Sequence, residues 1–303
     1  MGSRARARGA PVLAAVVVLV LAGDVYALRR NNTTPVDVGE AVQRFHQQRG
    51  ATEGAEPTTT SASGPEPPAP IGSTTVPPPG GVASARPPPV PAPGAPVAPG
   101  DLRPPAGVYR YRTDGSEQLS IGGSRRYPQM TTRTVRHGGG CTWTLEIALV
   151  EEHREQVSFC GTAQTLDLNA SRADVRWFGV SYPSEFTCSP PIRHVDRAAT
   201  PGATVAFSCR QSDGSTFTGT SVLGVVERVD VGGESRPAWR FRLDGRFEGK
   251  THGTVAVTEL IDQATGVTLI EQRANDLKQS TLLGDVGYRQ ELSVTIVSVT
   301  PQS

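Results

Sequence analysis

Residues 135–160, VRHGGGCTWTLEIALVEEHREQVSFC, show the pattern that decides the fold. Apolar and polar side chains alternate from Thr142 to Ile147, and a second alternating run leads to Cys160. A period of two is typical of a β-strand with one buried face. The two runs meet around Val150–Glu151, so the stretch is expected to form an antiparallel hairpin, with residues 151–153 exposed at its turn.

The chain contains four cysteines, which allow three disulfide connectivities. Hairpin geometry favours the pair Cys141–Cys160, because both residues are equally far from the hairpin centre and would lie opposite each other. Cys188 and Cys209 would then pair across a Pro-rich loop expected at residues 189–203. Each bridge closes a loop of about 20 residues, which is worth ~3 kcal/mol in the chain-entropy description. Two disulfides are typical of an exported protein.

The same period of two continues outward from this hairpin. It recurs in PAWRFRLDGRFEG (237–249) and in DVGYRQELSVTI (285–296). Further strands are expected near residues 107–113, 117–121, 127–136, 154–160, 174–180, 203–209, 216–231, 253–261 and 266–273. We therefore predict an all-β domain over residues 106–303, an antiparallel meander of about 10–12 strands that forms a curled sheet, barrel or sandwich. Its alternating acids and arginines are expected to pair across strands on the solvated face.

The N-terminus has the character of a membrane-targeting segment. Residues 1–9 form a basic tail, and residues 10–28 are mostly apolar. One interpretation is a single transmembrane anchor, and the other is a signal peptide cleaved after Ala27. Arg29 and Arg30 would hinder export of a cleaved chain, which favours the anchor. The expected location is the cell membrane, single-pass, with the C-terminal domain outside the cytoplasm; the alternative is a secreted protein.

Residues 29–47 are expected to be a juxtamembrane segment that contains a short amphipathic helix. Its apolar residues recur at the spacing of one helix face. They are Val38, Ala41, Val42 and Phe45. Asp37 and Glu40 fit a capping box at the helix N-terminus. The alternative is a transient helix in a disordered stalk.

Residues 48–105 are expected to be a disordered, Pro-rich stalk. Of the 26 prolines, 17 lie between Pro57 and Pro105, and the segment has few apolar side chains to bury. Proline runs favour extended, stiff conformations of ~3.1 Å per residue. Such a stalk could hold the domain up to roughly 180 Å from a membrane.

The motifs that suggest chemistry are weak. The sequence HGGG at His137–Gly140 is found in oxyanion holes of some hydrolases, but the chain has no GxSxG motif and no α/β alternation. His194 and His252 are expected to be isolated surface residues. No metal-ligand spacing and no phosphate-binding loop is present, so no cofactor and no metal site is predicted. A net charge of +1 does not support nucleic-acid binding.

The layout resembles that of uncharacterised single-pass membrane proteins of actinobacteria. The pieces that carry the likeness are VDVGEAVQRF, PPAGVYRYRTDGSEQLS, CTWTLEIALVEEHREQVSFC and ELIDQATGVTLIEQR. The resemblance implies an anchor, a Pro-rich stalk and an extracytoplasmic β domain, without an assigned activity. More loosely, the meander is similar to the half-barrels of bacterial lipoprotein carriers, which fold around a lipid but use capping helices and a lipobox cysteine that this sequence lacks.

These observations predict a non-enzymatic β domain anchored in the cell envelope, with a structural or protein-interaction role. The alternative is a carrier of a lipid or another hydrophobic ligand. The candidates to line its pocket are Trp143, Trp239, Phe241 and Phe247, for which ordinary core packing is the competing interpretation. The expected partners are the membrane, through the N-terminal segment, and either cell-wall or envelope proteins or a lipid.

Overall fold

A computed structural model describes residues 37–53, 101–282 and 284–302. The predicted basic tail, the apolar run at residues 10–28 and most of the predicted stalk lie outside these ranges. Within the described residues, no helix is long and apolar enough to cross a membrane.

The described residues contain thirteen strands and the helix α2. In chain order these are α2 (Val38–Glu53), β1 (Gly107–Leu119), β2 (Ser124–Arg126), β3 (Met130–His137), β4 (Thr142–Val150), β5 (His153–Gly161), β6 (Thr165–Trp177), β7 (Val180–Asp196), β8 (Ala203–Gln211), β9 (Thr216–Val231), β10 (Glu234–Glu248), β11 (Thr251–Asp262), β12 (Thr268–Thr281) and β13 (Gly284–Ile296). The predicted all-β class is confirmed, with thirteen strands in place of 10–12.

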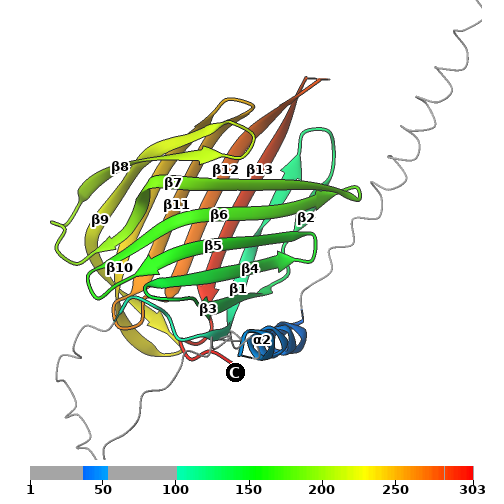
Figure 1. The fold of residues 1–303 in the computed structure, drawn as a ribbon. Coiled ribbons are helices and arrows are strands. Elements are labelled where there is room, and N and C mark those ends of the chain that lie inside the picture. The colour runs from blue at the N-terminus through cyan, green and yellow to red at the C-terminus, as the bar shows by residue number, and fades with distance from the viewer. Residues whose placement is uncertain (1–36, 54–100, 283, 303) are drawn as a thin grey trace, which may run out of the picture.

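The strands form one antiparallel sheet that closes on itself. Each strand from β3 to β13 pairs with its neighbour in sequence, and β1 pairs with both β3 and β13. Figure 1 shows β4–β7 crossing in front of β10–β13, so the ring has a front wall and a back wall. Alternate residues of each strand point to the same face, and the inward apolar side chains of both walls pack into one core cluster.

The sequence misplaced several strand boundaries. The two strands expected at residues 107–113 and 117–121 are one continuous strand, β1. Residues 174–180 were predicted to be one strand, but Phe178 and Gly179 form the turn between β6 and β7. The expected Pro-rich loop at residues 189–203 belongs largely to β7, which continues to Asp196. Pro190 and Pro191 lie in this strand where it pairs with neither β6 nor β8, so their missing N–H groups break no ladder hydrogen bond.

Both disulfides are present in the structure, with the predicted pairing. Cys141 and Cys160 have Cα atoms 4.8 Å apart. Their positions differ slightly from the expectation, since Cys160 lies opposite Thr142 and Cys141 precedes β4. The difference arises because the turn lies at Glu151–Glu152, further along the chain than the expected centre at Val150–Glu151, and a β-bulge between Ala148 and Val150 offsets part of the change.

The second disulfide joins β7 to β8, the two strands of the ring that share the fewest paired residues. β7 and β8 pair only over Phe186–Cys188 and Cys209–Gln211. Cys188 and Cys209 lie directly opposite each other, with Cα atoms 3.9 Å apart. The bridge therefore reinforces the point at which β7 and β8 diverge (Figure 1).

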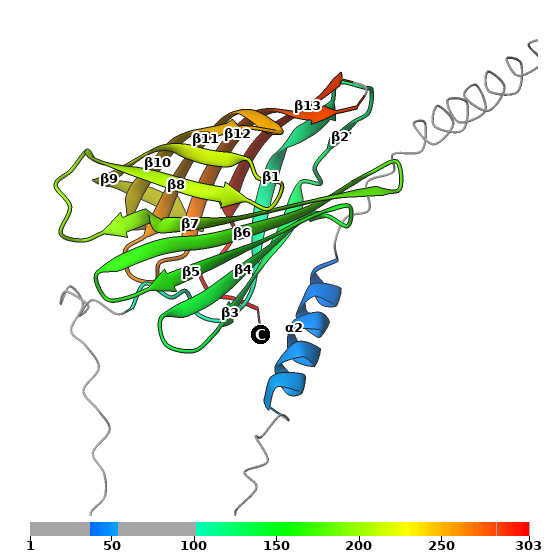
Figure 2. The same cartoon turned by 45° about the horizontal axis from the view of Figure 1, so that its top comes forward.

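Helix α2 has the expected apolar face but an unexpected location. Asp37 caps it by accepting a hydrogen bond from the Glu40 N–H at 3.1 Å. Ala41 and Phe45 are buried against the outer face of β1 and β4, in contact with Val108 and Ala148. The sequence placed this helix apart from the domain, beyond a stalk that began at residue 48. In the structure the helix continues to Glu53 and packs on the domain (Figure 2).

The domain also begins earlier than residue 106. Leu102 is fully buried, and its N–H donates to the Thr162 carbonyl at 2.9 Å. Both ends of the segment 54–100 therefore meet the β domain, one through α2 and the other through Leu102. The sequence led us to expect a stalk with the β domain at its C-terminal end only, and the structure differs from that expectation.

Candidate functional site

The interior of the ring has an aromatic region, which contains all four predicted pocket residues. Trp143, Trp239, Phe241 and Phe247 are each less than a tenth exposed and belong to one core cluster. Trp143 stacks on Phe159 and Phe247 stacks on Phe217, both with ring centroids 4.4 Å apart. The Arg197 guanidinium lies 5.2 Å from the Trp239 ring.

The ring of Phe241 is covered by His194, so each predicted pocket residue is in contact with another side chain of the protein. Phe241 and His194 stack with centroids 3.9 Å apart. His194 was predicted to lie on the surface, but this prediction is wrong, because β7 continues through it and its side chain is only 4% exposed. Its Nδ1 atom lies 3.4 Å from an oxygen of Glu259 on β11.

His252 differs from His194, although both have a carboxylate nearby. It is 36% exposed, and its Nε2 atom lies 3.3 Å from Asp285. A buried histidine beside a carboxylate would favour an enzyme if the pair opened into a cleft. Neither of the two hollows described below is lined by His194 or Glu259.

The other part of the interior contains charged side chains. Seven ionisable residues form a continuous chain, and none is more than 15% exposed. In order of contact they are Arg125, Glu117, His153, Glu155, Arg273, Glu271 and Arg133. We call this set the charged chain. Its members come from β1, β2, β3, β5 and β12, so it spans the ring from wall to wall.

Two of its ion pairs cross the space between the walls. Arg273 on β12 donates from one nitrogen to both Glu155 oxygens on β5, at 2.7 and 2.8 Å. Arg133 on β3 donates to Glu271 on β12 at 2.6 Å. Arg273 also lies 2.7 Å from Glu271, so it joins the two pairs. Hydrogen-bonded pairs of this kind compensate the cost of burying each charge.

His153 links the remaining part of the charged chain. Its Nδ1 atom is 2.8 Å from Glu117, and its Nε2 atom is 3.0 Å from Glu155. Tyr288 donates its hydroxyl to Glu117 at 2.6 Å, and Arg125 donates to the same carboxylate. The sequence placed His153 exposed at the hairpin turn, which is wrong. It is the first residue of β5 and is 2% exposed.

These contacts set the protonation states of His153 and Glu117. Burial by itself lowers the pKa of His153, but the negative charge of Glu117 and hydrogen bonds to Glu117 and Glu155 raise it to about 9. Burial raises the pKa of Glu117, but the positive charges of His153 and Arg125 and the Tyr288 hydroxyl lower it to about 2. At neutral pH the imidazolium and the carboxylate are therefore both charged, which completes an alternation of positive and negative groups along the charged chain.

Sequence reasoning missed this cluster by assigning the charged residues to the solvated face. Part of the signal was present. Glu155 has the same parity as Val157 and Phe159 in β5, so the period of two places all three on one face. Arg133 likewise shares the parity of Val135 in β3. What no local pattern shows is the partner of each charge, because Glu155 and Arg273 are 118 residues apart.

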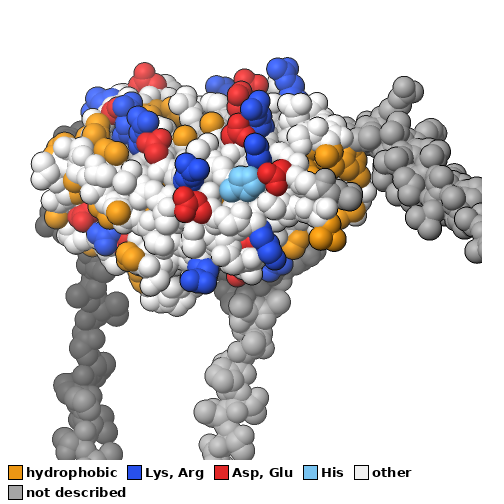
Figure 3. Space-filling view, turned by 90° about the horizontal axis from the view of Figure 1, so that it is seen from above, with side chains coloured by type: hydrophobic (Ala, Val, Ile, Leu, Met, Phe, Trp, Pro, Cys, Tyr) orange, Lys and Arg blue, Asp and Glu red, His pale blue; other side chains and the backbone are white. Residues whose placement is uncertain are grey.

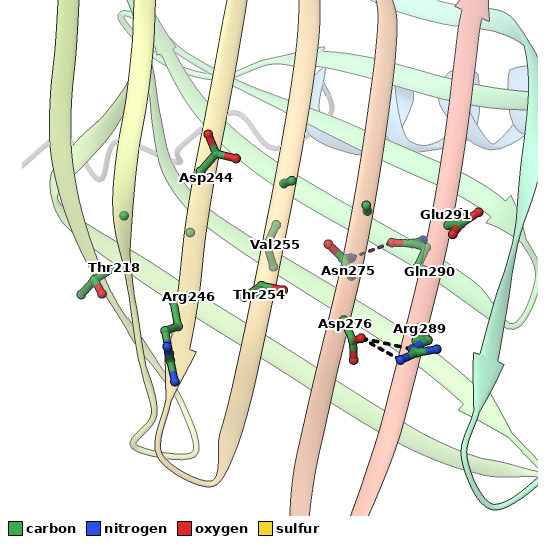
Figure 4. A pocket seen from close by; sticks show the side chains of 14 residues that line it. Thr218, Asp244, Arg246, Thr254, Val255, Asn275, Asp276, Arg289, Gln290 and Glu291 are labelled. Carbon is green, nitrogen blue, oxygen red and sulfur yellow. Dashed lines mark hydrogen bonds and ion pairs between the residues drawn. The ribbon is translucent and has the colours of Figure 1, made fainter.

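A hollow of about 680 Å³ lies on the outer surface of the back wall. Figure 4 shows it across β9–β13, with the Asp276–Arg289 ion pair at one side. Gly219, Gly245, Ala256 and Ala274 are among the residues that line it. A neighbouring hollow of about 370 Å³ shares Ala256 and Ala274.

The glycines of this hollow are required by the core behind it. A Cβ atom on Gly245 would lie 2.4 Å from the Phe217 ring, and one on Gly219 would lie 2.2 Å from the Asp244 carbonyl oxygen. Their small size is thus explained by inward crowding, and it gives no indication of close approach by a ligand. The hollow is an open depression of the outer face, and charged side chains such as Asp276 and Arg289 are among those that line it.

The remaining motifs have structural roles. His137–Gly140 forms the turn between β3 and β4, where Gly138 donates to the Thr142 carbonyl at 2.9 Å. The His137 ring lies 2.7 Å from the Pro104 carbonyl. Among the described residues, no group of His, Cys, Asp and Glu side chains is placed to hold a metal ion.

Comparison with known proteins gives little further information. No protein-family description matches the sequence, and no curated protein matches it. The resemblance to actinobacterial membrane proteins therefore has no support from these comparisons. Among solved structures, the hypothetical lipoprotein YmcC from Escherichia coli is similar over 59% of this chain and 85% of its own, with 11% sequence identity and a TM-score of 0.28.

Proposed function

We propose that this protein is a non-enzymatic, membrane-anchored β domain of the cell envelope, with a structural or protein-interaction role. The observation that carries the proposal is the packing of the interior. Trp143, Phe241 and Phe247 stack on other rings of the protein and Trp239 lies against Arg197, while the charged chain occupies another part of the space between the walls. Recognition of a partner would then use the outer surface, where the hollow of the back wall lies.

The location rests on two features of the sequence and one of the structure. The apolar run at residues 10–28 and the arginines that flank it favour an anchor. The two disulfides are typical of a compartment outside the cytoplasm. Cell-wall or envelope proteins are the proposed partners of the outer surface.

Native mass spectrometry of the full chain, purified from its membrane in mild detergent without delipidation, tests the proposal. We expect the mass of the polypeptide alone once the detergent is removed. A stoichiometric hydrophobic mass that disappears on denaturation would contradict the filled interior and would make the protein a carrier.

One observation favours the carrier alternative. Val255, Val257 and Leu277 face inward from β11 and β12 but are only partly buried. They would form the entrance to an apolar ligand site. If a ligand is bound there, Val257→Asp should abolish the bound mass, whereas Ala256→Asp, at the exposed neighbouring position that faces outward from β11, should leave it unchanged.

A further inference from the structure

Exposed apolar side chains gather at one end of the molecule. Ile121 lies in the β1–β2 turn and is 56% exposed, while Val180 and Tyr182 lie just after the β6–β7 turn and are 53% and 48% exposed. Leu282, at the end of the β12–β13 hairpin, is completely exposed. Figure 3 shows hydrophobic side chains at the end of the surface where the β6–β7 hairpin lies. Exposed apolar side chains grouped at one end of a small domain are typical of a binding surface.

These turns are held together. A Cβ atom on Gly123 would lie 3.0 Å from the Phe178 ring, so the β6–β7 turn lies against the β1–β2 turn. The Arg125 guanidinium stacks on the Trp177 ring at 4.3 Å and donates to the Arg176 carbonyl at 2.9 Å. The Ser120 N–H donates to the Gly287 carbonyl at 2.8 Å, which connects the β1–β2 turn to β13. We call Ile121, Phe178, Val180, Tyr182 and Leu282 the apolar tip.

The backbone at Phe178 supports a role for this surface. Its φ of 54° is the only positive value at a non-glycine residue in the described part of the chain. Gly179 follows with a φ of 79°, and a two-residue hairpin turn of this kind favours Asn or Gly at the first position. A bulky phenylalanine at that position costs conformational energy. Its ring packs beside Gly123 and Trp177, which holds the β6–β7 turn, and with it Val180 and Tyr182, against the β1–β2 turn.

The position of α2 indicates what covers the tip. Figure 2 shows α2 beside the front wall, with its N-terminal end toward the β4–β5 and β6–β7 hairpins. In the sequence, only residues 29–36 separate α2 and its cap from the apolar run at residues 10–28. Eight residues span at most ~28 Å when extended. Because α2 is docked on the domain, this short segment sets the distance to the anchor, and residues 54–100 do not.

We propose that the apolar tip lies against the lipid bilayer that holds the anchor of the same chain. Turns with exposed aliphatic and tyrosine side chains suit the interface between headgroups and acyl chains, where an amphipathic ring can keep its hydroxyl in water. The domain is therefore oriented at the membrane surface, with the hollow of the back wall left accessible to envelope partners. This inference rests on the membrane anchoring in the proposed function.

Site-specific fluorescence in phosphatidylcholine vesicles tests the inference with the full chain. All four native cysteines are in disulfides, so a single introduced cysteine can be labelled. Ile121→Cys and Leu282→Cys report on the tip, and Val226→Cys is the matched control, because Val226 is 55% exposed and Ile121 is 56% exposed. The Leu282 side chain is fully exposed, so its replacement does not disturb folding.

We expect lipids that carry a nitroxide near the headgroup to quench labels at positions 121 and 282 at least several-fold more than the label at 226. Equal quenching at all three positions in a chain that floats with the vesicles would overturn the inference and leave the anchor intact. A chain that does not float with the vesicles would overturn the anchor itself, and the inference with it.

Discussion

The two regions of the ring interior have the same strand architecture and opposite chemistry. Around Phe241 the inward positions are aromatic and aliphatic, whereas around Arg273 they are charged and paired. Burial of apolar area stabilises the first region without regard to orientation. The second region depends on hydrogen-bond geometry, because each charge is deeply buried. Removing the partner of such a charge destabilises the folded protein. The difference teaches that alternation identifies the inward face but does not predict how tolerant that face is to substitution.

The largest expected effect is the loss of a charge from the charged region. Arg273→Ala leaves Glu155 and Glu271 buried without their shared partner, and we expect the free energy of unfolding to fall by about 3–5 kcal/mol in urea denaturation. The control is Arg242→Ala, whose ion pair with Asp244 is 60% and 51% exposed, and which should cost less than about 1 kcal/mol. Equal effects of the two substitutions would remove the distinction between buried and exposed pairs.

In the aromatic region, Phe241→Ala should lower the free energy of unfolding by about 3–4 kcal/mol, because it leaves a cavity beside His194. Phe241→Leu should cost much less, about 1 kcal/mol, since it retains most of the volume. Urea denaturation of both variants measures the difference. If Phe241→Leu were as damaging as Phe241→Ala, the region would depend on aromatic stacking more than on filled volume.

Two disulfides cross-link the sheet. Loss of the Cys188–Cys209 bridge between β7 and β8 should increase local opening of the sheet more than loss of the Cys141–Cys160 bridge. Cys188→Ser and Cys141→Ser should each lower stability by ~3 kcal/mol, since the closed loops are of similar length. Only Cys188→Ser should raise amide hydrogen exchange in β8, because few ladder hydrogen bonds hold β7 to β8. Equal exchange in β8 for both variants would mean that the short ladder is sufficient.

The smallest effect is the pH dependence of the charged region. His153 has a pKa of about 9 in the folded state against 6.5 ordinarily, so its contribution is complete below pH 6.5 and is lost as the pH rises through 9. We expect a loss of roughly 2–3 kcal/mol over this range. Glu117 acts in the opposite direction, since its contribution is present above pH 4.5 and is lost as the pH falls toward 2.

Denaturation at pH 6.5 and pH 9.5 measures the alkaline loss, and His153→Gln is the control that should remove most of it. Phe241→Ala should keep the alkaline loss, because the aromatic region does not contain His153. If the free energy of unfolding of His153→Gln fell with pH as steeply as that of the unsubstituted protein, the pH dependence would belong to another group, such as Tyr288 beside Glu117.

Much of the local structure could be predicted from the sequence. Alternation located most strands, the spacing of Ala41 and Phe45 gave the buried face of α2, and hairpin symmetry gave the Cys141–Cys160 pairing. The strand that contains Pro190 was missed, because an unpaired strand edge tolerates the same prolines that a loop does. His153 was misplaced because its neighbours Glu151 and Glu152 are turn residues, and one position decides between turn and strand.

By itself, the sequence determined the period of the strands, the residues that share a face, and the pairing of cysteines near one hairpin, because these depend on neighbours along the chain. Only the tertiary structure decided that Glu155 meets Arg273, that Arg133 meets Glu271, and that α2 rests on the outer face of the ring. The physical reason is that a period fixes which side chains point together, but closure of β1 on β13 and the crossing of the two walls decide what they point at.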